Sequence, residues 1–108
     1  MAPTEAERAL LKGELDRLVA QLVASAAADW PVSADHCFLR IAYDNAVGAR
    51  WDTVVTRPAW RHLSLDQLAA AVAILEQVLD KGRPALVTLN ATSLDHRRRA
   101  RRSLGELA

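Results

Sequence analysis

The chain has few glycines, and they lie far apart. The four are Gly13, Gly48, Gly82 and Gly105, in a chain of 108 residues. A phosphate-binding loop needs several glycines close together so that backbone amides can reach the phosphates. The sequence therefore has neither a P-loop nor a dinucleotide-binding fingerprint. It also lacks the Gly-x-Ser-x-Gly turn of hydrolases and the His-Glu-x-x-His pair of metalloproteases.

Cysteine and histidine are also scarce. The single cysteine, Cys37, excludes an internal disulfide and a cysteine-based zinc site. The three histidines, His36, His62 and His96, lie on separate segments, so no two of them stand at helical ligand spacing. We therefore predict neither a metal site nor a cofactor.

No apolar run approaches the ~18 residues that a membrane span requires. The first residues, MAPTEAERALLKGELDR, carry acidic side chains early and no apolar block, which is the opposite of a secretory signal. A composition of 51% hydrophobic and 25% charged residues is typical of a soluble globular domain. Together with the abundance of Ala, Arg and Leu, these features predict a single-domain, cytoplasmic, bacterial protein.

The first half of the chain predicts two helices. A Thr4-x-x-Glu7 capping box opens the first helix, and leucines three or four residues apart line one of its faces as far as about Ala28. These leucines are Leu11, Leu15, Leu18 and Leu22. We expect a second helix over residues 34–47, capped by Ser33 and stopped by Gly48.

The second half predicts two more helices. A capping box at Ser64-Leu65-Asp66-Gln67 opens a helix that ends near Gly82, with an apolar stripe at Leu68, Val72, Leu75 and Leu79. Arg83-Pro84 begins the last helix, in which the polar segment 90–93 predicts a kink. We expect an extended connector at 53–56. The fold predicted is all-α, a single-domain four-helix arrangement with a long irregular connection between helices 2 and 3.

Arg40 and Asp44 stand four residues apart on an otherwise apolar helix. Such a pair is typical of a partly buried ion pair that orients helix packing. Alternatively, it belongs to a polar pocket beside Gly48 that holds an anionic or planar ligand, because arginine grips carboxylates and stacks on aromatic rings. The further residues of this predicted pocket are Asn45, Trp51, Asp52 and Arg57.

Two tryptophans, Trp51 and Trp60, flank the connector, with Arg50 and Arg61 just outside them. In a small bundle both indoles are expected to plug the core while the arginines keep their charged ends in water. The alternative is a surface that stacks bases and contacts phosphates.

The net charge of +1 conceals a basic C-terminus. Residues 96–108 contain five arginines and one glutamate, whereas residues 1–48 contain four basic and seven acidic side chains. An arginine cluster attracts phosphate backbones, docks on an acidic protein, or is a solvated helix end that complements the helix dipole. The cluster is Arg97, Arg98, Arg99, Arg101 and Arg102.

The segments CFLRIAYDNAVGARWDTVVTRPAWRHLSLDQLAAAV and ALVTLNATSL resemble a group of short, uncharacterised bacterial helical proteins, some of which carry an acetyltransferase label. The resemblance covers about residues 36–97. That label implies a mixed sheet and a Gln/Arg-x-x-Gly-x-Gly/Ala loop for the coenzyme pyrophosphate. This chain has no such loop and no strands for a sheet, so no acetyl-coenzyme A site is carried over.

We therefore predict a small helical adaptor or regulatory protein that works by binding rather than by catalysis. Residues 1–96 would form the helical domain, and residues 97–108 a basic extension of its last helix. The five clustered arginines would contact nucleic acid or an acidic protein, with Arg50, Arg57 and Arg61 as a second patch. The leucine-striped helices would form the core or a homodimer interface. The alternative function is a small-ligand-binding or enzymatic domain built on the predicted pocket.

Overall fold

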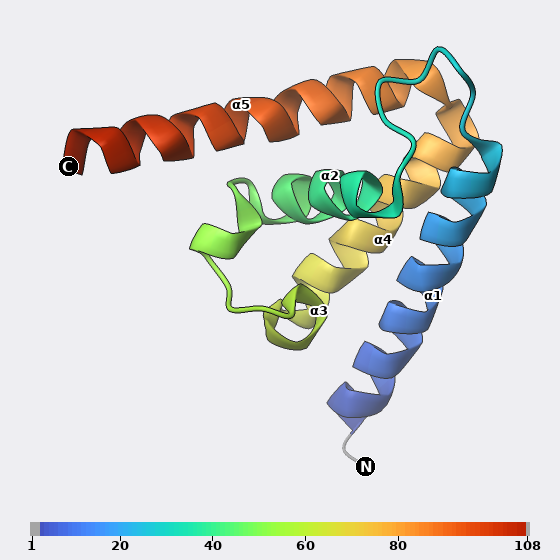
Figure 1. The fold of residues 1–108 in the computed structure, drawn as a ribbon. Coiled ribbons are helices and arrows are strands. Elements are labelled where there is room, and N and C mark those ends of the chain that lie inside the picture. The colour runs from blue at the N-terminus through green and yellow to red at the C-terminus, as the bar shows by residue number, and fades with distance from the viewer. Residues whose placement is uncertain (1–2, 108) are drawn as a thin grey trace.

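The computed structural model describes residues 3–107, and these are helical throughout except for the connections (Figure 1). The long helices are α1 (Pro3–Ser25), α2 (Asp35–Val47), α4 (Leu65–Lys81) and α5 (Arg83–Leu107). Two short helices, η1 (Trp51–Thr53) and α3 (Ala59–His62), lie in the long connection between α2 and α4. The described residues contain no strand, so the predicted all-α class is confirmed.

Local signals set several of the helix ends. The Ser64 hydroxyl accepts a hydrogen bond from the Gln67 amide (3.0 Å), and the Gln67 side chain accepts one from the Ser64 amide (2.9 Å), as the predicted capping box requires. Gly48 ends α2 in the left-handed region, at φ 78°. A glycine suits this position because a Cβ would be strained there.

Other predicted boundaries and caps were wrong. Thr4 lies inside α1, which begins at Pro3, and α1 ends at Ser25 rather than near Ala28. The residue preceding α2 is Ala34 rather than Ser33, and it makes no side-chain cap. The amide of His36 in the first turn is instead satisfied by the Asp35 carboxylate (2.6 Å). The extended connector predicted at 53–56 is wrong in its first half: Thr53 closes the 3-10 turn η1, and Val54 continues that turn in the right-handed helical region.

The leucine stripes of α1 and α4 face each other and α2. The fully buried side chains of this core include Leu15, Leu18, Leu22, Phe38, Ile41, Leu68 and Leu75. Burial of these side chains against one another supplies the main stabilisation of the bundle. Most of both stripes is buried within one chain. A homodimer through these helices would therefore need the remaining exposed residues, such as Leu79 (37% exposed) at the edge of the α4 stripe and Leu10 (75% exposed) on the outer face of α1.

The tryptophans belong to the architecture. Trp51 is 8% exposed and packs on Tyr43 in a T-shaped arrangement, with ring centroids 5.5 Å apart. Trp60 is half-buried and packs against the same core from α3, with the Arg61 guanidinium over its ring at 5.1 Å. Both tryptophans therefore pack on the core, as we predicted. Trp51 is buried there, whereas Trp60 is only half-buried.

Helix α5 crosses the end of the bundle and then continues beyond it (Figure 1). Its first half packs on α2 and α4 through Ala85 and Leu86, whereas its C-terminal half reaches past the end of α2. The helix is unbroken from Arg83 to Leu107, including residues 90–93, where we predicted a kink. Within that segment, Asn90 and Ser93 contact α2, whereas the Thr92 hydroxyl donates to the Thr88 carbonyl of α5 itself. With extents of 44 × 38 × 17 Å, the molecule is a thin slab.

Candidate functional site

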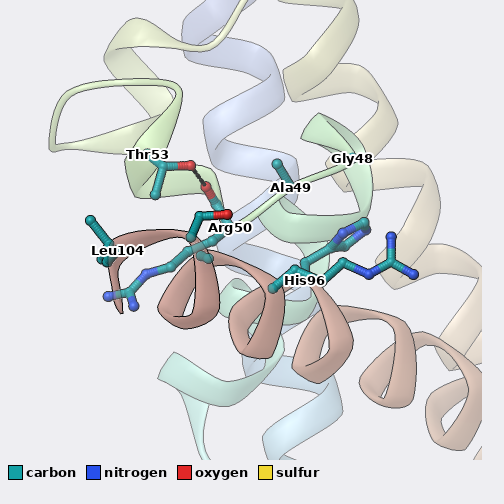
Figure 2. A pocket seen from close by; sticks show the side chains of 9 residues that line it. Gly48, Ala49, Arg50, Thr53, His96 and Leu104 are labelled. Atoms are coloured by element: carbon teal, nitrogen blue, oxygen red, sulfur yellow. Dashed lines mark hydrogen bonds between the residues drawn. The ribbon is translucent and has the colours of Figure 1, made fainter. Parts of the chain in front are cut away.

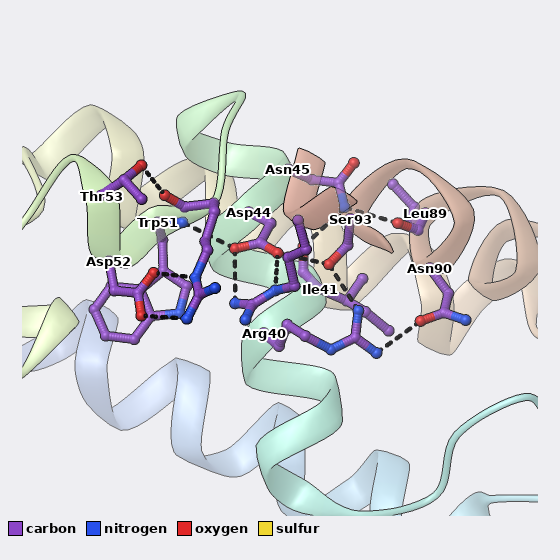
Figure 3. A network of polar contacts seen from close by, with 12 residues as sticks. Arg40, Ile41, Asp44, Asn45, Trp51, Asp52, Thr53, Leu89, Asn90 and Ser93 are labelled. Atoms are coloured by element: carbon purple, nitrogen blue, oxygen red, sulfur yellow. Dashed lines mark hydrogen bonds and ion pairs between the residues drawn. The ribbon is translucent and has the colours of Figure 1, made fainter. Parts of the chain in front are cut away.

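A fully buried carboxylate lies at the junction of α2, η1 and α5. Asp44, on α2, is 0% exposed. Its oxygens accept hydrogen bonds from the Trp51 backbone amide (3.0 Å), the Ser93 hydroxyl (2.7 Å), and Arg97 Nε and Nη2 (2.7 and 3.2 Å) (Figure 3). A buried charge is tolerated only when it is paired and hydrogen-bonded. Asp44 meets that condition with one partner from η1, Trp51, and two from α5, Ser93 and Arg97.

Arg40 reaches this carboxylate only through a serine. Arg40 Nη1 donates to the Ser93 hydroxyl (2.7 Å), and Arg40 Nη2 donates to the Asn90 side-chain oxygen (2.8 Å) (Figure 3). The direct Arg40–Asp44 ion pair that we predicted does not form. The reason is that Arg97, from a helix 53 residues further along the chain, occupies the carboxylate with a two-pronged contact.

Arg40 thereby has only neutral partners. Among the side chains that the structure describes, no carboxylate oxygen lies within 4.0 Å of its guanidinium nitrogens. Arg40 is also half-buried, so water screens its charge only in part. This leaves a positive charge beside the buried network without an anion of its own.

A second charged cluster lies on the connector. Asp52 accepts hydrogen bonds from Arg50 Nε and Nη2 (2.7 and 3.2 Å) and from Arg57 Nη2 (3.1 Å). The hydrogen bonds from Arg50 lower the pKa of the Asp52 carboxyl, and Asp52 in turn raises the pKa of Arg50. The Arg57 guanidinium lies 4.8 Å from the centroid of the Trp51 ring, over its face.

A cavity of about 320 Å³ opens between these two clusters. Its lining residues come from α2, the connector and α5: His36, Leu39, Arg40, Tyr43, Trp51, Arg57 and Arg97. Three guanidinium groups thus converge on a cavity that has two aromatic walls. Burial, reinforced by the negative charge of Asp16, raises the pKa of the Tyr43 phenol to about 12, so that wall is neutral across the physiological range.

The predicted pocket residues are brought together, but in different roles. Arg40, Trp51 and Arg57 line the cavity, while Asp44 and Asp52 lie behind it and hold Arg97 and Arg57 in place. The side-chain nitrogen of Asn45 (Nδ2) donates to the backbone carbonyls of Ile41 (2.8 Å) and Leu89 (3.0 Å). Asn45 therefore ties α2 to α5 and does not line the cavity.

Sequence reasoning missed Asn90, Ser93 and the inward role of Arg97. These residues recur at spacings of three and four on α5, which places them on one side of the helix. That polar stripe was the available signal, and it was interpreted as a kink. The fully buried Ser93 hydroxyl donates to Asp44, so it is closed to any substrate as a nucleophile.

The predicted arginine patches divide between three places. Arg97 faces inward at 22% side-chain exposure, whereas Arg98 and Arg99 are 61% and 72% exposed and share the Asp95 carboxylate (3.2 and 3.0 Å). Arg101 and Arg102 are exposed, and no described carboxylate oxygen lies within 4.0 Å of either. Arg61 lies apart on Trp60, beside a hollow that α1 and α3 line together.

Arg50 and the C-terminal half of α5 line the same groove. This groove has a volume of about 460 Å³ and separates residues 48–53 of the connector from the C-terminal half of α5 (Figure 2). Arg50 lines its connector side, and Arg99, with His96 and Leu104, lines its α5 side. Of the predicted second patch, Arg50 is therefore the member that lies next to the basic end of α5.

Comparison with known proteins adds no relative: no protein-family model, no curated protein and no solved structure matches this chain. The resemblance to short bacterial helical proteins stays a prediction. Among the side chains that the structure describes, no three of His, Cys, Asp or Glu are grouped as a metal site. Within residues 3–107, no helix has the length and apolar character needed to span a membrane.

Proposed function

We propose that this chain is a small, cytoplasmic, non-catalytic helical protein that binds nucleic acid through the basic end of α5, which we define as residues 95–105. The observation that carries the proposal is the exposure of four arginines on a helix that extends beyond the bundle (Figure 1). These are Arg98, Arg99, Arg101 and Arg102.

The arrangement of these arginines around the helix supports a phosphate-binding role. Ser93 and Arg97 mark the side of α5 that faces the body. At about 100° per residue, Arg98, Arg99 and Arg102 lie on the opposite side, and Arg101 lies on one flank. About half of the helix circumference is therefore positive, with Asp95 as the one acidic side chain described in this segment.

An α-helix with its side chains is about 10–12 Å across and fits the major groove of B-DNA, which is about 12 Å wide. A helix lying there has phosphates on both sides, so arginines distributed around it find partners on both strands. Arg50 adds a contact from the connector, across the groove that it shares with Arg99 (Figure 2). An acidic protein surface would engage one face only, and we therefore favour nucleic acid.

The proposal is tested by the salt dependence of binding to DNA and RNA, as duplexes and as single strands. We expect log K to fall linearly with log salt, with a slope of about −0.9 per phosphate contacted on duplex DNA. Substituting Arg98, Arg101 and Arg102 by Gln together should reduce the magnitude of that slope by about 2–3 and weaken binding at every salt concentration.

The matched control replaces three exposed arginines elsewhere, Arg17, Arg61 and Arg83, by Gln, which lowers the net charge equally. This variant should bind almost as the parent chain does. Equal losses in the two triple variants would mean that only net charge matters, and the basic end of α5 would not be the site. If the parent chain binds none of the nucleic acids at low salt, nucleic acid is the wrong partner, and an acidic protein becomes the occupant to test.

A further inference from the structure

The cavity between α2, the connector and α5 carries more positive charge than its own carboxylates balance. The two clusters beside the cavity together hold two carboxylates, Asp44 and Asp52, and four guanidinium groups. Three of these guanidiniums, on Arg40, Arg57 and Arg97, line the cavity, whereas Arg50 pairs with Asp52 from outside it. Two positive charges are left, and one of them resides on Arg40, which has only neutral partners. An anion that entered the cavity would restore the balance.

The arginines that line the cavity also have guanidinium nitrogens that make no hydrogen bond to the described residues. Hydrogen bonds to described residues use Nη1 and Nη2 of Arg40, Nε and Nη2 of Arg97, and Nη2 of Arg57. Arg40 Nε, Arg97 Nη1, and Arg57 Nε and Nη1 make none of those bonds. A guanidinium fork matches the oxygens of a carboxylate or phosphate in spacing and in charge.

The guanidiniums are held in place before any ligand arrives. Arg97 is clamped by Asp44, Arg40 by Ser93 and Asn90, and Arg57 by Asp52 and the Trp51 face. Arg40 and Arg97 therefore have little side-chain entropy left to lose on binding, which favours affinity, whereas the exposed Arg57 side chain keeps more of it. We propose that this cavity binds the oxyanion group, carboxylate or phosphate, of a small molecule.

The walls limit the size and character of that molecule. A volume of about 320 Å³ lies at the small end of the range of ligand sites. Leu39, Tyr43 and Trp51 give the cavity an apolar side next to its guanidinium side. The ligand expected is therefore a compact acid whose remainder is planar or apolar.

The test is an NMR titration of the full chain with inorganic phosphate and, separately, with benzoate, against sodium chloride of equal ionic strength. We expect saturable shifts at the Trp51 indole N–H and at the side-chain Nε–H signals of Arg40 and Arg97. Saturation by benzoate alone, by phosphate alone or by both supports the site and identifies its oxyanion. The absence of saturable shifts with either probe overturns it.

Two substitutions locate the binding. Arg40→Gln and Arg57→Gln should each weaken the saturable binding at least about tenfold, since each removes a charged donor to the anion. The matched control, Arg61→Gln, removes an arginine that stacks on a tryptophan outside the cavity and should leave the affinity unchanged. Should Arg40→Gln unfold the chain, Arg57→Gln decides, because the Arg57 side chain is 72% exposed.

The inference is independent of the proposed nucleic-acid contact. The variant with Gln at positions 98, 101 and 102 should keep the saturable response to phosphate or benzoate, and Arg40→Gln should keep nucleic-acid binding. Equal affinity of the parent chain and of both cavity variants for the probe would show that the anion binds elsewhere, whatever α5 does.

Discussion

Asp44 holds three elements together at the scale of a single residue. Asp44 is fully buried, and its charge is compensated by Arg97. Two further donors, the Trp51 backbone amide on the connector and the Ser93 hydroxyl on α5, also bond to it. Removing one partner of a buried ion pair typically costs about 3–5 kcal/mol, because the other charge is left uncompensated. The pair therefore controls where the connector and the middle of α5 lie, and with them the walls of the cavity.

Tyr43 is the only tyrosine of the chain, so its titration can be followed directly. Burial raises its pKa from 10.0 to about 12. Below pH 10 the phenol is protonated in both the folded and the unfolded chain. Between pH 10 and 12 the unfolded chain loses this proton first, so the free energy of unfolding should fall by about 2–3 kcal/mol over that window from this group alone.

Near-ultraviolet absorbance of tyrosinate checks the pKa of Tyr43, and urea unfolding at several alkaline pH values checks the loss of stability. Other groups titrate in the same range, so the comparison is with Tyr43→Phe, which keeps the ring against Trp51. The difference in stability between parent and variant should change in favour of the variant from pH 10 to 12. An ordinary tyrosinate titration near pH 10 in the folded chain would contradict the prediction.

At the scale of an element, replacing a glycine by alanine should have opposite effects on stability at a helix end and in a helix interior. Gly48 ends α2 at φ 78°, whereas Gly13 lies within α1, and an added Cβ meets no atom within 4 Å at either position. Gly48→Ala should destabilise the chain by about 1 kcal/mol, because alanine is strained in the left-handed region. Gly13→Ala should stabilise it by about 0.5–1 kcal/mol through helix propensity.

The two variants serve as controls for each other, since each adds the same methyl group in open space. Urea unfolding followed by circular dichroism measures both. Changes of the same sign in the two variants would contradict the conformational explanation.

At the scale of the whole molecule, α5 has two roles. Its residues up to Arg97 pack on the helical bundle, and its residues after Arg97 form the proposed nucleic-acid interface. The boundary predicted between residues 96 and 97 would separate Arg97 from Asp44, although α5 runs through that position unbroken. A chain ending at Asp95 should therefore lose about 3–5 kcal/mol of stability, because Asp44 is left buried without its positive partner.

A chain ending at Ala100 keeps Arg97 and is the matched control. It should retain most of the stability while lacking Arg101 and Arg102. Urea midpoints of the two shortened chains make the comparison, and equal midpoints would show that the Asp44–Arg97 pair contributes little. The same pair of chains separates loss of folding from loss of nucleic-acid contacts, because the longer one stays folded.

Much of the helical framework could be predicted from local patterns. The spacing of Leu15, Leu18 and Leu22 and the Ser64–Gln67 capping box depend on residues within one or two turns of each other. Helix geometry alone converts such spacing into a buried face and a satisfied helix start. The all-α class, and the use of Trp51 as a plug, followed from these patterns and from composition.

The composition of the cavity could be predicted in part, but its pairings could not. The sequence predicted that Arg40, Asp44, Trp51 and Arg57 belong to one pocket, because they are close along the chain. It did not reveal that Asp44 would choose Arg97 over Arg40, since that choice depends on how α5 crosses α2 and on which turn of α5 lies over Asp44. Crossing and register are set by the packing of all the helices together. Helix positions were thus determined locally by the sequence, and only the tertiary structure decided which charges pair and which remain free for a ligand.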